Sequence, residues 1–131
     1  MIESTQFILY VSNQQKSCDF YMKTLGMEPV LNVEGMTEFE LSGGTKLGIM
    51  PEKGIAKILG SMLPEPSSAK GVPRCELYLL VDDPDLYLKR SIDAGALEIS
   101  PLQKRAWGDT AGYVADLDGH VIAFAQKSLI Q

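Results

Sequence analysis

The sequence predicts an α+β fold made of two tandem modules, each with the element order β-α-β-β-β. The first observation behind this prediction is a repeat: the apolar run of residues 6–11 returns at residues 76–81, so that Leu9 aligns with Leu79. The second is that each run is followed by a stretch with helical spacing that ends at a glycine. A repeat of this kind predicts two half-domains that share one core and leave a cleft between them.

The first module opens with the β-rich run of residues 6–11. Ser12 and Asn13 offer an N-cap, because short polar side chains accept hydrogen bonds from free backbone N–H groups. The helix that follows has one apolar stripe, formed by Cys18, Tyr21, Met22 and Leu25. Gly26 is placed for a left-handed C-cap. Three strands are expected next, near residues 29–33, 36–41 and 46–50.

The second module repeats this order. A strand is expected at residues 76–81, and Asp83 is placed to cap a helix that has Pro84 in its first turn. Gly95 is expected to end that helix. Strands then follow near residues 97–104, 110–116 and 121–126, with Asp118-Gly119 as the hairpin turn between the last two.

The expected domain organisation is a single domain over residues 1–131. The first module covers residues 5–50 and the second residues 75–127. Residues 51–74 connect them and are rich in proline, glycine, serine and lysine. A short amphipathic helix is expected there from the spacing of Ile55, Ile58, Leu59 and Met62. A plain linker and a lid over the cleft are both open readings of this segment.

Composition excludes several classes of partner. A formal net charge of -5 and a pI near 4.8 argue against nucleic acid and against an anionic membrane surface. Two cysteines, Cys18 and Cys75, are too few for a disulfide scaffold, and reduced, buried thiols are expected. The N-terminus shows no basic region followed by an apolar run, and no apolar stretch approaches the ~20 residues that span a bilayer. A cytoplasmic protein is therefore expected.

Two segments carry a family resemblance. Residues 20–28 read Phe-Tyr-Met-Lys-Thr-Leu-Gly-Met-Glu and resemble the FYxxxLGFE segment of the vicinal oxygen chelate superfamily, also called the glyoxalase/bleomycin-resistance/dioxygenase superfamily. Trp107-Gly108, followed by residues 112–120, is similar to the part of that family that ends in DPDGH. The resemblance covers about residues 5–126. It implies two βαβββ modules in a curved mixed sheet around a cleft, and assembly as a homodimer.

The resemblance also gives four positions at which metal-dependent members carry histidine or glutamate ligands: Gln6, Gly48, Glu76 and Ala123. Only Glu76 offers a strong ligand, and Gln6 offers a weak neutral oxygen. A catalytic divalent metal normally needs three protein ligands and an open position. The sequence therefore predicts no intrinsic catalytic metal and no other cofactor. The single histidine, His120, is expected to serve the hairpin turn.

The strand period of two gives these positions their neighbours on the same face. Ile8 and Tyr10 join Gln6, Tyr78 and Leu80 join Glu76, Met50 joins Gly48, and Ala125 joins Ala123. Such an apolar, partly aromatic face resembles a small-molecule pocket, although plain core packing is the alternative. Gly48 and Ala123 favour the pocket because they leave room. The predicted ligand-binding residues are Gln6, Ile8, Tyr10, Gly48, Met50, Glu76, Tyr78, Trp107 and Ala123.

Trp107 is the only tryptophan. Metal-free bleomycin-resistance proteins, which its segment resembles, place a Trp-Gly pair nearby and stack planar drug rings on the indole. Stacking of this kind is worth about 0.5–1.5 kcal/mol beyond the burial of area. A tryptophan that only packs in the fold or in a dimer interface is the alternative.

Two functional hypotheses follow. The first is a metal-free cleft that binds a small, partly aromatic molecule. The second is a glyoxalase-like lyase or isomerase in which Glu76 serves as the catalytic acid/base, with a raised pKa, or as a metal anchor. Lys104 or Arg105 is a candidate partner for the Glu76 carboxylate. Whether the protein is an enzyme is left open by the sequence.

Overall fold

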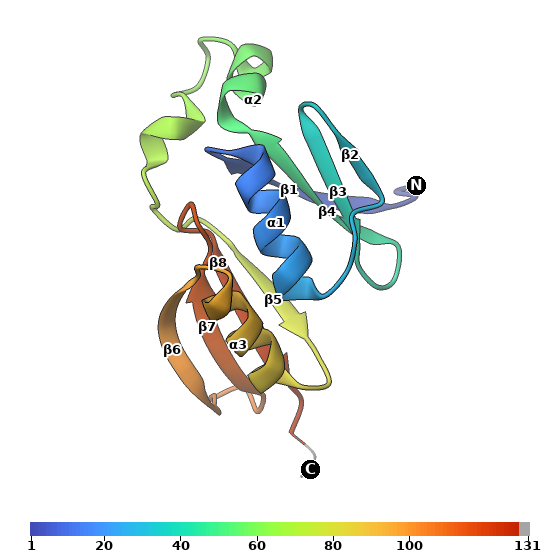
Figure 1. The fold of residues 1–131 in the computed structure, drawn as a ribbon, viewed down its shortest axis with the longest axis vertical. Coiled ribbons are helices and arrows are strands. Elements are labelled where there is room, and N and C mark those ends of the chain that lie inside the picture. Colours follow the sequence, from blue (N-terminus) through green and yellow to red (C-terminus); the bar gives the residue numbers. More distant parts are fainter. Residues whose placement is uncertain (129–131) are drawn as a thin grey trace. The chain divides into compact units, whose positions relative to one another are not determined.

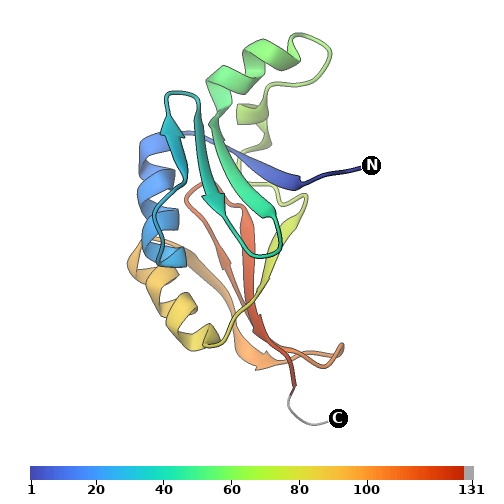
Figure 2. The ribbon, with the colours of Figure 1, turned by 90° about the vertical axis from the view of Figure 1, so that its right-hand side faces the viewer.

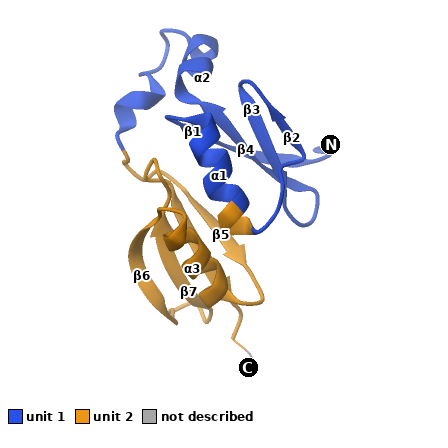
Figure 3. Ribbon diagram, in the orientation of Figure 1, with its two compact units in different colours: residues 1–22, 26–70 blue, residues 23–25, 71–131 orange. Residues whose placement is uncertain are grey.

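The computed structural model describes residues 1–128, which form two compact units (Figure 3). The first unit comprises residues 1–22 and 26–70, and the second comprises residues 23–25 and the chain from Gly71 onward. Each unit holds a four-stranded sheet in which the first strand is parallel to its neighbour and the other pairs are antiparallel. The predicted α+β class and the repeated β-α-β-β-β order are confirmed.

The elements of the first unit are closely those expected from the sequence. They are β1 (Thr5–Val11), α1 (Gln14–Leu25, which belongs to this unit as far as Met22), β2 (Leu31–Val33), β3 (Met36–Glu40) and β4 (Thr45–Pro51), with the strand order β1-β4-β3-β2 (Figure 1). The Asn13 side chain caps α1 by accepting a hydrogen bond of 3.0 Å from the backbone N–H of Lys16. Gly26 ends α1 in the left-handed conformation, with φ of 69°.

The helix α1 covers one face of the first sheet. The Tyr21 ring lies 6.4 Å from the Phe39 ring on β3, and both side chains are fully buried. Leu47 and Ile49 share this buried face, because side chains alternate along β4. The residues between them point the other way. That opposite side, which we call the first open face, carries Gln6, Ile8, Tyr10, Glu38, Lys46, Gly48 and Met50.

The connecting segment contains α2 (Glu52–Leu59) and a 3-10 turn, η1 (Pro66–Ala69). The expected short amphipathic helix is therefore present. Ile55 is buried, whereas Ile58, one turn further along the same face of α2, is 74% exposed.

The second unit contains β5 (Glu76–Leu80), α3 (Pro84–Asp93), β6 (Leu97–Lys104), β7 (Thr110–Ala115) and β8 (Val121–Gln126). Its strand order, β5-β8-β7-β6, repeats that of the first unit. Asp83 caps α3 by accepting from the backbone N–H of Leu86 at 3.3 Å. The helix ends at Asp93 with Ala94 as its C-cap, so that Gly95, with φ of 113°, lies one residue beyond the cap position expected for it.

The helix α3 covers one face of the second sheet, as α1 does in its own unit (Figure 2). The Tyr87 ring lies 5.4 Å from the buried Phe124 ring on β8. A Cβ atom added to Gly112 on β7 would lie 2.6 Å from Leu88 Cδ1, so the glycine lets Leu88 of α3 sit directly on the strand. The side of the sheet away from α3, which we call the second open face, carries Glu76, Tyr78, Leu80, Ala111, Tyr113, Ala123 and Ala125.

Strand pairing shows that the two halves match in register as well as in order. In the first unit β1 pairs with β4 so that Ile8 faces Gly48, and in the second β5 pairs with β8 so that Tyr78 faces Ala123. This confirms that Gly48 and Ala123 occupy equivalent positions.

The hairpin turn between β7 and β8 is built around Asp116. Its Oδ1 atom accepts from the backbone N–H groups of Asp118 and His120, each at 2.9 Å. Gly119 has φ of 89°, and a Cβ atom on it would lie 2.7 Å from the Cα atom of Gly71. His120 thus belongs to the turn, as expected.

Composition-based expectations are met in part. Cys18 is buried, and its burial, reinforced by the charges of Asp19 and Glu28, raises the pKa of the thiol. Cys75 is exposed, so the expectation that it is buried is wrong: it lies just before β5, outside the sheet. Within residues 1–128, no helix has the length and apolar character needed to cross a membrane.

Candidate functional site

On the first open face, three polar side chains form a chain across three strands. The Gln6 side chain on β1 donates from Nε2 to Glu38 Oε2 on β3 at 2.9 Å. Lys46 Nζ on β4 lies 3.4 Å from Glu38 Oε1, completing an ion pair. The Gln6 amide is therefore held by its own sheet. Sequence reasoning missed Glu38, although strand alternation places it on this face, opposite Gly48.

The space expected above Gly48 is filled. A Cβ atom built there would lie 2.5 Å from Gln6 Nε2 and 3.0 Å from Ile8 Cγ1. The expectation that this glycine leaves room for a ligand is therefore wrong, because side chains of β1 occupy that room. Tyr10 and Met50, which face each other in register one step further along the strands, are half-buried.

On the second open face, Tyr78, Ala123 and Tyr113 form one row across β5, β8 and β7. Tyr78 lies in a hydrogen-bond chain: its hydroxyl donates to Asp109 Oδ2 at 2.7 Å and accepts from Trp107 Nε1 at 2.9 Å. The rings of Tyr78 and Trp107 meet edge to face, with centroids 6.5 Å apart. We call Tyr78, Trp107 and Tyr113 the aromatic cluster. Ala123, at the centre of the row, is fully buried, so the room expected above it is occupied as well.

The indole of Trp107 is both exposed and held in place. Trp107 lies in the turn between β6 and β7, which is closed by backbone hydrogen bonds from Arg105 to Asp109 and from Gly108 to Arg105. The side chain is 59% exposed, while its single N–H group is satisfied by Tyr78. A flat ring presented to solvent in a fixed orientation suits stacking with a planar molecule.

Arg105 supports this face from the side. Its Nε and Nη2 atoms donate to the backbone oxygen of Ala111 at 3.0 and 2.9 Å. Nη2 also donates to the Pro101 carbonyl at 2.8 Å and to Ser100 Oγ at 2.9 Å, where the pairing of β6 with β7 shifts register. The guanidinium lies 5.1 Å from the centre of the Tyr113 ring. Sequence reasoning suggested Arg105 or Lys104 as a partner for Glu76, but Arg105 serves the β6–β7 irregularity instead, and Lys104 forms no ion pair with any residue in the described range 1–128.

Glu76 lies on the second open face, two residues before Tyr78. Its side chain is exposed, and within residues 1–128 no side chain hydrogen-bonds to its carboxylate or pairs with it. The cost of burying an unpaired carboxylate therefore does not arise, because water solvates the group.

The four positions transferred from metal-dependent relatives do not fit a catalytic divalent metal. Gly48 and Ala123 supply no side-chain donor, and the amide of Gln6 is engaged by Glu38. Among the residues that the structure describes, no three histidine, cysteine, aspartate or glutamate side chains gather where they would hold a metal ion.

The environment of Tyr78 predicts a specific pH dependence. Burial, together with the hydrogen bond to Asp109 and that residue's charge, raises the pKa of Tyr78 above its usual 10.0, although the Trp107 hydrogen bond acts in the opposite direction. Below about pH 10 the Tyr78 phenol is protonated in both the folded and the unfolded state. As the pH rises above about 10, the phenol of the unfolded state ionises first, so the folded state binds more protons and stability falls. Urea unfolding of the wild type should therefore show a steeper loss of stability above pH 10 than Tyr78→Phe; equal slopes would contradict the assignment.

Comparisons with known proteins agree with this architecture. The sequence model of the Glyoxalase/Bleomycin resistance protein/Dioxygenase superfamily matches residues 4–124. An uncharacterized protein of Mycobacterium tuberculosis (strain ATCC 25618 / H37Rv) is 28% identical over 115 residues, which are 86% of this chain and 67% of that protein. The crystal structure of a glyoxalase-related enzyme from Fulvimarina pelagi has a TM-score of 0.81 at 21% identity, covering 97% of this chain and 89% of that one. A hypothetical protein from S. aureus has a TM-score of 0.78 at 24% identity, with coverages of 96% and 94%.

Proposed function

Because this chain belongs to the Glyoxalase/Bleomycin resistance protein/Dioxygenase superfamily, whose model matches residues 4–124, we propose that it binds a small, planar, partly aromatic molecule. The ligand stacks on the aromatic cluster of the second open face, and no metal takes part. The contacts expected on the first open face, Gln6, Ile8, Tyr10 and Met50, stay predictions, and Gly48 is left out because side chains of β1 fill the space above it. Homodimer assembly and a cytoplasmic location stay predictions.

The observation that carries this proposal is the hydrogen-bond chain from Trp107 through Tyr78 to Asp109. An exposed aromatic side chain normally loses rotational freedom when a ligand orders it, and that loss weakens binding. Here the indole N–H and the Tyr78 hydroxyl fix both rings before a ligand arrives. The affinity gained from ring stacking is therefore retained more fully than on a mobile tryptophan.

The remainder of the second open face favours the same kind of ligand. Ala111, Ala123 and Ala125 make this face apolar but are themselves fully buried, whereas Leu80 at the end of β5 is 50% exposed. Apolar walls supply burial, and a few fixed polar groups orient the molecule. Asp109 and Glu76 are the acidic groups that β5 and the β6–β7 turn bring to this region.

The proposal is tested by screening planar aromatic compounds by thermal shift in the presence of a chelator. A ligand is expected to raise Tm equally with and without chelator and to quench tryptophan fluorescence. Trp107→Ala should weaken its binding about tenfold or more, because losing both the ring stacking and the apolar area that the ligand covers costs about 1.4 kcal/mol or more.

Leu86→Ala is the matched control, since Leu86 is an exposed apolar residue on α3, which covers the other face of the same sheet. Binding to this variant should be unchanged. A ligand that binds Trp107→Ala as tightly as the wild type, or a library that shifts neither Tm nor fluorescence, would overturn the proposal.

A second candidate function rests on the position of Glu76. Its exposed, unpaired carboxylate shares a face with Tyr78, so a molecule held by the aromatic cluster would lie within reach of an acid/base group. A glyoxalase-like lyase or isomerase would use it to move a proton. This candidate requires that Glu76→Gln abolish turnover of a bound compound while leaving its affinity within about threefold; turnover at the wild-type rate would remove it.

A further inference from the structure

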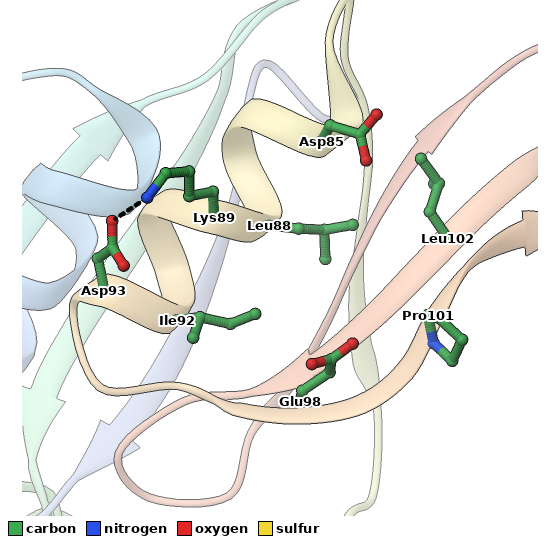
Figure 4. Close-up of a pocket in the computed structure, with 8 residues that line it drawn as sticks. All are labelled: Asp85, Leu88, Lys89, Ile92, Asp93, Glu98, Pro101 and Leu102. Atoms are coloured by element: carbon green, nitrogen blue, oxygen red, sulfur yellow. Dashed lines mark hydrogen bonds and ion pairs between the residues drawn. The ribbon is translucent and has the colours of Figure 1, made fainter.

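The second unit has a groove on the side of its sheet that carries α3, away from the aromatic cluster (Figure 4). One wall is α3, where Asp85, Leu88 and Ile92 recur at helical spacing along one face. The other wall is β6, which contributes Glu98. The groove has a volume of about 450 Å³. This volume falls within the roughly 300–1,000 Å³ typical of small-molecule sites.

The floor of the groove is apolar and firmly supported. Leu88 is half-buried and rests on Gly112 of β7, where a Cβ atom would lie only 2.6 Å from it. Ile92, one turn further along α3, is 41% exposed and extends the apolar surface. A ligand with an aliphatic or ring body would cover this surface and be stabilised by the apolar area that it removes from water.

The acidic part of the groove is the part that holds Asp85 and Glu98. At the other end Lys89 and Asp93 form an ion pair at 3.1 Å, and Lys23 Nζ, which donates to the Asp93 carbonyl at 3.3 Å, adds a positive charge. Asp85 and Glu98 have no ion-pair partner among residues 1–128. In the view of Figure 4, Leu88 lies between these two carboxylates, which come from opposite walls.

We propose that this groove binds a small organic cation with an apolar body, such as an alkylammonium. The apolar part lies on Leu88 and Ile92, and the positive group lies between Asp85 and Glu98. The two unpaired carboxylates would repel an anion of the same size. The charge of the groove therefore selects cations, and the apolar floor buries the apolar part of the ligand. The site is independent of the aromatic cluster, because the sheet separates the two faces.

The test is a titration of ¹⁵N-labelled protein with hexyltrimethylammonium, followed by two-dimensional NMR. Shifts are expected in backbone amides of α3 and β6, and none in the Trp107 indole N–H. Hexanoate and 1-hexanol, which share the six-carbon chain without the positive charge, should bind at least about tenfold more weakly. Raising the salt concentration should weaken the binding of the cation, because the carboxylates are exposed.

The double variant Asp85→Asn/Glu98→Gln is expected to weaken cation binding about tenfold, since each exposed charge contact contributes a factor of a few. Glu34→Gln, which removes an exposed carboxylate in the turn between β2 and β3, is the matched control and should bind as the wild type does. Trp107→Ala should also bind normally. The proposal is overturned by equal binding of hexanoate, by an unchanged affinity of the double variant, by shifts centred elsewhere, or by no shifts up to the solubility limit of the probe.

Discussion

Replacing Gly119 with alanine is expected to lower the free energy of unfolding by about 3 kcal/mol. Two effects add. The residue has φ of 89°, a conformation that costs a side chain about 1 kcal/mol or more. A Cβ atom would also lie 2.7 Å from Gly71 Cα and 3.1 Å from the Gly71 carbonyl oxygen. Since both contacts are to backbone, no side-chain rotation relieves them, and the chain near Gly71 must shift.

Gly35→Ala separates these two effects. Gly35 has a similar φ of 95°, but a Cβ atom there meets nothing within 4 Å. This variant should lose only the conformational part, about 1 kcal/mol. Urea denaturation of the two variants and the wild type measures both values. Equal losses would show that close packing of the Gly119 turn on Gly71 contributes nothing to stability.

Replacing Arg105 with methionine is expected to cost about 2–4 kcal/mol, because it removes four hydrogen bonds and leaves the Ala111 and Pro101 carbonyls without their donor. Pro101 lies within the irregular part of the β6–β7 pairing, between Ser100 and Gln103, and Ala111 pairs with Gln103 at the edge of that part. The long apolar side chain of methionine retains most of the packing against Tyr113. The loss of stability therefore measures the loss of the guanidinium hydrogen-bond donors.

Lys104→Met is the control for this variant. Lys104 is the neighbouring cation, is exposed, and forms no ion pair within residues 1–128. Its replacement should change the free energy of unfolding by no more than about 0.5 kcal/mol. Chemical denaturation compares the two. If Arg105→Met were as mild as Lys104→Met, the β6–β7 irregularity would not depend on Arg105.

The fold was predictable from the sequence because its determinants are local and repeated. Strand runs, capping residues and glycines at positive φ each act within a few residues, and the second half of the chain repeats the first. The small departures have local causes as well. For example, α3 ends at Asp93 because Ala94 already closes its last turn, with its backbone N–H pointing to Arg90, and Gly95 is used in the following turn.

The candidate site was less predictable, because its geometry depends on side chains that meet across strands. The alternation of β1 correctly placed Gln6 and Ile8 on one face, but it gave no sign that they fold over Gly48. The pairing of Trp107 with Tyr78 joins residues 29 positions apart. The sequence predicts Arg105 as a partner for Glu76, whereas its donors serve the irregular pairing of β6 and β7, which Pro101 within β6 could have signalled.

The indole N–H resonance of Trp107 provides the most direct test of ligand binding at the aromatic cluster. Trp107 is the only tryptophan, so this resonance is unique in a ¹⁵N-correlated NMR spectrum, and its proton is the one donated to Tyr78. In chelator-treated protein, a planar ligand identified by thermal shift should move this resonance progressively and saturably, with the amides around Tyr78 and Asp109 moving along the same binding curve. A ligand that binds with the Trp107 indole resonance unmoved, or that binds only when a metal is restored, would contradict the account.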